Sequence, residues 1–62
     1  MSLPMNEPEA AKWISQFKVG DLPAISERLR EAAADETNDD WTREYMERLA
    51  ARVDEEFVAR AS

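Results

Sequence analysis

The chain has 62 residues, of which 14 are acidic and 8 are basic, so that its net charge is −6. It contains no Cys and no His, which excludes a disulfide framework and removes the most versatile nucleophiles and metal ligands. A chain of this length forms one domain at most and buries only about 60% of the surface that its unfolded form exposes. We expect a single helical domain over residues 6–61, with residues 1–5 as a disordered tail or a cloning remnant.

The first predicted helix spans about residues 7–19. Asn6 is suited to cap its start, and Glu9 three residues later completes a pair that resembles a capping box. Four apolar side chains then follow at the spacing of one helical face: Ala10, Trp13, Ile14 and Phe17. Lys18 is expected in the last turn, and Gly20 is expected to end the helix in a left-handed conformation.

The second predicted helix spans about residues 22–34. Asp21 is expected to cap its start, and Pro23 fits its first turn. An apolar stripe follows: Leu22, Ile25, Leu29, Ala32 and Ala33. The polar run at residues 35–38 then ends the helix, because short polar side chains compete with the helical backbone.

The third predicted helix, over about residues 39–60, is the longest. Five large apolar side chains recur in it at every fourth position: Trp41, Tyr45, Leu49, Val53 and Phe57. This stripe drifts across roughly 160° of the helix surface, which exceeds the arc of about 100° that one docking surface needs. Either the helix has a second contact surface, or it lies in a groove between the other two. The fold class is therefore all-α, a small three-helix bundle with the longest helix at its C-terminal end.

Known arrangements of catalytic or metal-binding residues do not fit the chain. Ser15, Ser26 and Thr42 have only carboxylates or lysines available as a base, so we expect no enzyme activity. A calcium loop could begin at Asp35, but the position that requires Gly holds Asp40, and the final Glu is replaced by Met46. We therefore expect no metal site and no cofactor.

Two alternatives involve nucleic acid. Residues 17–29 resemble a helix-turn-helix with Arg28 and Arg30 on its second helix, although Asp21 and the net charge oppose phosphate binding. The opposite alternative is an acidic mimic of nucleic acid. Its surface would comprise Asp35, Glu36, Asp39, Asp40, Glu44 and Glu47, interrupted by Arg43 and Arg48.

The function that we favour is a protein–protein interaction module, acting as a small acidic regulator, inhibitor or accessory subunit. The charge favours a partner with a basic surface, and not nucleic acid itself. The contact residues expected from the third helix are Trp41, Tyr45, Leu49, Val53 and Phe57. Because so small a core is marginal, we also expect a homodimer through this helix. No run of about 20 apolar residues and no secretory signal is evident, so we expect no membrane contact and a cytoplasmic location.

Overall fold

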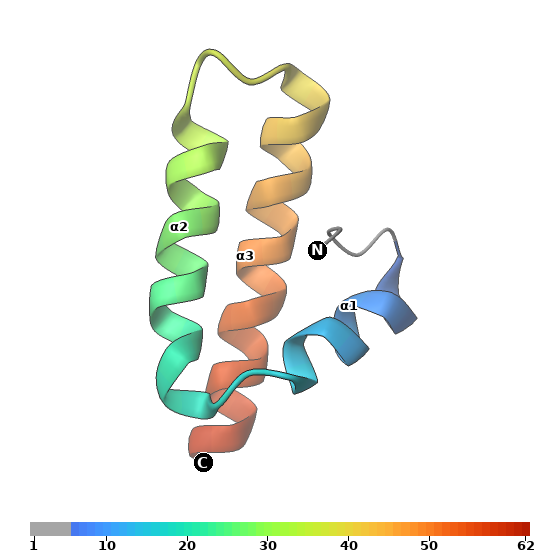
Figure 1. Cartoon of the computed structure of the whole chain (residues 1–62), viewed down its shortest axis with the longest axis vertical. Coiled ribbons are helices and arrows are strands. Elements are labelled where there is room, and N and C mark those ends of the chain that lie inside the picture. The colour runs from blue at the N-terminus through green and yellow to red at the C-terminus, as the bar shows by residue number, and fades with distance from the viewer. Residues whose placement is uncertain (1–5) are drawn as a thin grey trace.

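The computed structural model describes residues 6–62, and none of these residues lies in a β-strand. The elements are α1 (Glu7–Ser15), the short 3₁₀ helix η1 (Val19–Asp21), α2 (Leu22–Ala34) and α3 (Asp40–Ala61). Helices α2 and α3 lie side by side as an antiparallel hairpin, and the shorter α1 crosses beside the middle and C-terminal turns of α3 (Figure 1). The predicted all-α, three-helix fold with the longest helix last is confirmed. The predicted tail at residues 1–5 lies outside the described residues.

The core lies where the three helices meet. Its buried apolar residues are Ala10, Ile14, Leu22, Leu29, Leu49, Ala50 and Val53. One large side chain from each helix is almost completely shielded from solvent, with Ile14 at 1% and Leu22 and Val53 at 0% exposure. Each such side chain stabilises the folded state by about 1.5–3 kcal/mol, so these three hold the helices together.

Side-chain caps begin both α1 and α3. The Oδ1 atom of Asn6 accepts a hydrogen bond from the backbone N–H of Glu9 at 3.0 Å, as the sequence predicts. Asp39 accepts from the backbone N–H of Thr42 at 3.0 Å in the same way. Each cap satisfies an N–H group that the helix itself leaves unpaired, which fixes where the helix begins.

The end of α1 differs from the prediction, because the helix ends at Ser15 and does not reach residue 19. The backbone tightens first, with Phe17 donating to the carbonyl of Ile14 at 3.1 Å, and Lys18 then adopts an extended conformation. Gly20 has no positive φ and lies within η1, so the expected left-handed cap is wrong. Lys18 likewise lies outside the helix.

The start of α2 at Leu22 matches the prediction, but Asp21 makes no side-chain cap there. Helix α2 continues directly from η1, in which Asp21 donates to the carbonyl of Lys18 at 3.0 Å and Leu22 donates to that of Val19. The preceding turn thus supplies acceptors for these N–H groups, and the Asp21 carboxylate is not needed. Pro23 fits the first turn as expected.

The loop between α2 and α3 is held by its own polar side chains. Asp35 accepts hydrogen bonds from both the backbone N–H and the hydroxyl of Thr37, and these bonds lower the pKa of its carboxyl group. Asn38 donates to the carbonyl of Ala32 at 2.9 Å, and Arg43 donates to that of Ala33 at 3.0 Å. The last carbonyls of α2 are therefore satisfied from beyond the turn, as helix ends require.

Helix α3 packs against both other helices, which accounts for its wide apolar arc except at Trp41, which remains 63% exposed. Leu49 and Val53 lie in the shared core, and Phe57 packs against its edge. The arrangement corresponds to the second of the two sequence-based interpretations, a helix seated between its neighbours. Among residues 6–62, none of the helices combines the length and apolar character needed to cross a bilayer.

Candidate interaction surface

The five predicted contact residues divide into buried and exposed members. Leu49 and Val53, at 5% and 0% exposure, belong to the core of the single chain, and the half-buried Phe57 packs against that core. Trp41 is 63% exposed, and Tyr45 is half-buried one turn further along α3. Of the five, only Trp41 is exposed, while Tyr45 and Phe57 are both half-buried against the core.

Trp41 and Tyr45 form a stacked aromatic pair on α3. Their ring centroids are 5.5 Å apart and the ring planes differ by 5°. Tyr45 packs against the core, and the exposed indole of Trp41 stacks on its partly buried phenol ring. The Tyr45 hydroxyl is buried and has no hydrogen-bond partner within the part of the chain that the structure describes. Its burial, together with the nearby charge of Glu9, raises the pKa of Tyr45.

A row of exposed side chains, which we term the outer stripe, continues from Trp41 along α3. Its members are Trp41, Glu44, Arg48, Ala51, Glu55 and Val58. They recur at alternating intervals of three and four residues, which is the spacing of a seam between two paired helices. Trp41 and Val58, at 63% and 65% exposure, are the most exposed large apolar residues described on α3. Apolar periodicity alone misses this stripe because three of its members are charged.

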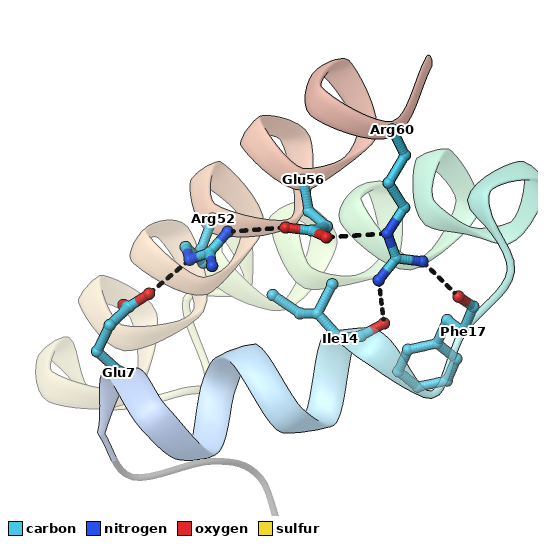
Figure 2. Close-up of polar contacts among 6 residues, drawn as sticks. All are labelled: Glu7, Ile14, Phe17, Arg52, Glu56 and Arg60. Atoms are coloured by element: carbon cyan, nitrogen blue, oxygen red, sulfur yellow. Dashed lines mark hydrogen bonds and ion pairs between the residues drawn. The ribbon is translucent and has the colours of Figure 1, made fainter. Parts of the chain in front are cut away.

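The side of α3 that faces α1 is occupied by a chain of ion pairs, which we term the polar ladder (Figure 2). Glu7 of α1 accepts from Arg52 at 2.6 Å. Arg52 reaches Glu56 at 3.4 Å, and Glu56 accepts from Arg60 at 2.9 Å. The two arginines lower the pKa of Glu56, with the hydrogen bond from Arg60 as the largest cause. The polar ladder thus joins the start of α1 to the last turns of α3.

Arg60 also holds the other end of α1. Its guanidinium group donates to the backbone carbonyl of Phe17 at 2.7 Å and to that of Ile14 at 3.3 Å (Figure 2). These carbonyls lie at and just beyond the end of α1, where the helix has too few N–H donors for its last carbonyls and a positive charge is favourable. A side chain from the end of the sequence therefore completes the first helix.

The side of α3 that faces α2 is also occupied. Arg30 donates to Glu47 at 2.8 Å and forms a second ion pair with Asp54. The pKa of Asp54 is lowered, first by a hydrogen bond from the buried Ser26 and then by Arg30. The outer stripe is consequently the face of α3 that neither helix covers.

The basic residues of the helix-turn-helix alternative do not form a positive face. Arg30 lies between two carboxylates, and the exposed Arg28 lines a shallow groove together with Glu27, Glu31 and Asp35. A phosphate approaching α2 would meet more negative than positive charge.

Several carboxylates of the nucleic-acid-mimic alternative already have partners within the chain. Asp35 and Asp39 accept local hydrogen bonds, which lower the pKa of both groups. Glu44 pairs with Arg48 at 3.9 Å, and Glu47 pairs with Arg30. The surface therefore carries paired charges of both signs, unlike a run of phosphates.

Residues 6–62 contain no group of three or more side chains placed to hold a metal ion. No protein-family model, no curated protein and no solved structure matches the chain. The functional interpretation consequently rests on the geometry of the outer stripe.

Proposed function

We propose that the chain is a protein–protein interaction module that binds its partner through the outer stripe of α3. It would act as a small acidic regulator, inhibitor or accessory subunit, carrying out no reaction of its own, in the cytoplasm. The observation that supports this proposal is the exposure of Trp41, at 63%, on a stripe in which half of the residues are charged.

The stacked pair is well suited to binding. Trp and Tyr are enriched among the residues that dominate binding energy at protein interfaces. A Trp side chain buries about 150–250 Å² when it is covered, so an exposed indole offers a large apolar gain to a partner. Stacking on Tyr45 restrains the ring in advance, which reduces the entropy lost when a partner covers Trp41.

The charges next to Trp41 favour a protein partner over nucleic acid. Glu44, one turn from Trp41, forms an exposed ion pair with Arg48 one turn further along, so the surroundings of Trp41 on the outer stripe carry charges of both signs. Such polar surroundings are typical of protein interfaces, whereas nucleic-acid sites concentrate positive charge.

The test places a photo-crosslinking amino acid, benzoylphenylalanine, at position 41 in living cells. The matched control carries the same amino acid in place of Glu27, which is exposed on α2 outside the outer stripe. We expect a protein adduct from position 41 and none from position 27, with mass spectrometry identifying the captured chain. Equal labelling at both positions, or no protein adduct from position 41, would contradict the proposal.

A further inference from the structure

We infer that the partner of the outer stripe is a second copy of this chain, paired so that the two α3 helices run antiparallel. The inference rests on the proposed function and names the partner of the same surface. It follows from two properties of the outer stripe, the positions of its apolar residues and the order of its charges.

The two large apolar residues of the outer stripe lie near opposite ends of the helix. Trp41 follows the first residue of α3, and Val58 lies in its last turn, so that about 25 Å of helix separates them. In an antiparallel pair related by a two-fold axis, Trp41 of each copy lies opposite Val58 of the other. The same contact then forms twice, as a self-complementary interface requires, and both exposed apolar residues become buried.

The charges of the outer stripe oppose a parallel pair. Parallel helices in register would place Glu44, Arg48 and Glu55 each against the same residue of the second copy, which is repulsive at all three positions. The antiparallel register places Arg48 opposite the small Ala51 and one turn from Glu55 of the second copy. Glu44 faces that same Glu55, a repulsive contact that occurs twice, but Arg48, which pairs with Glu44 at 3.9 Å, lies one turn from both carboxylates and offsets it.

The strength of the pair follows from its composition. Each copy contributes Trp41, Ala51 and Val58 as apolar contacts, while the other members of the outer stripe are charged. A seam with so few apolar positions gives a weak dimer, which forms at micromolar concentration and is favoured as concentration rises.

Sedimentation equilibrium of the purified protein tests association. We expect an average mass above the 7.1 kDa of one chain at about 100 micromolar, approaching twice that value as concentration rises. Trp41→Ser and Val58→Ser should each raise the dissociation constant of the dimer by about tenfold or more. The Trp41–Val58 contact occurs twice in the dimer, and either substitution removes it at both places. The matched control is Val19→Ser, which removes an exposed apolar residue of η1 outside the outer stripe. Circular dichroism verifies that each variant remains helical.

Disulfide trapping tests orientation, because the natural chain has no Cys to interfere. An equimolar mixture of Glu44→Cys and Glu55→Cys chains is oxidised under mild conditions. The antiparallel register predicts mainly mixed disulfides between the two variants. Mainly disulfides between identical variants would overturn this register.

The two proposals fail in different ways. A purified chain that stays at 7.1 kDa, or a Val58→Ser variant that dimerises as tightly as the wild type, overturns the homodimer. If position 41 then crosslinks to a different protein in cells, the interaction module stands and its partner is another chain. If position 41 captures no protein at all, the proposed function itself is wrong.

Discussion

Gly20 is the residue at which a sequence rule and the structure differ most. A glycine after a helical pattern usually adopts a left-handed conformation, but Gly20 has no positive φ, and an added Cβ atom would meet nothing within 4 Å. Gly20→Ala should therefore stabilise the protein by about 0.4–1 kcal/mol, because alanine lowers the entropy of the unfolded chain. Urea unfolding measures this change. A destabilised variant would indicate that Gly20 does require a left-handed backbone.

Tyr45 supports Trp41 but leaves its own hydroxyl unpaired among the described residues. Tyr45→Phe removes the oxygen and keeps the ring, so we expect an unchanged free energy of unfolding or a gain of up to about 1 kcal/mol. Thermal and urea unfolding measure the difference. In the wild type, spectrophotometric titration should show the phenol ionising above its ordinary pKa of 10.0. A loss of stability on removing the hydroxyl would reveal a hydrogen bond to it.

At the scale of single elements, α1 depends on α3 for its stability. Its nine residues are fewer than an isolated helix needs in water, so its order must come from packing and from the polar ladder. The ladder and the two carbonyl contacts of Arg60 hold α1 at both ends, whereas the core contacts of Ala10 and Ile14 lie between them.

Removing Arg60 should loosen α1 selectively. Arg60→Met deletes the hydrogen bonds to the carbonyls of Ile14 and Phe17, and we expect a loss of about 1–3 kcal/mol. Hydrogen exchange should become faster in α1 with little change in α2. The control is Arg48→Met at low protein concentration, because Arg48 is 82% exposed and its pair with Glu44 contributes less than about 1 kcal/mol. Uniformly faster exchange throughout the chain would contradict a selective role.

At the scale of the whole molecule, paired carboxylates make stability depend on pH. The folded state lowers the pKa of Asp35, Asp39, Asp54 and Glu56. Because the pKa of each carboxyl group is lower in the folded state, the unfolded chain takes up the proton first as pH falls. Each carboxylate therefore contributes fully to folded-state stability above its ordinary pKa, and this contribution is lost as pH falls through the lowered pKa. The ordinary values are 3.8 for Asp and 4.5 for Glu.

We therefore expect the melting temperature to fall as pH is lowered below about 4.5 and through the lowered pKa values. Circular dichroism melts across this range measure the effect. Glu56→Gln should reduce the slope of melting temperature against pH, because one of the four groups no longer titrates. The variant should also be less stable than the wild type near neutral pH. A wild-type melting temperature that rises on acidification would indicate that relief of the net charge of −6 outweighs these pairs.

The sequence by itself determined the helical class, the limits of α2 and the approximate limits of α3. It did so because the signals are local: Asn6 caps α1, Pro23 fits the first turn of α2, and the polar run at 35–38 separates α2 from α3. Each acts through the backbone within a few residues, so that reading neighbouring positions suffices.

The tertiary structure decided where α1 ends and which apolar residues remain exposed. Helix α1 ends at Ser15, and its terminal carbonyls bind Arg60, which is far away in the sequence. Trp41 and Val53 share one periodic stripe, yet Trp41 is 63% exposed and Val53 is fully buried. The difference arises because α1 is short: its first turn lies near Tyr45 and Leu49 and its end near Arg60, so that it does not extend to the first turn of α3 (Figure 1). Burial depends on which helices reach a position in space, and the periodicity of a single helix does not contain that information.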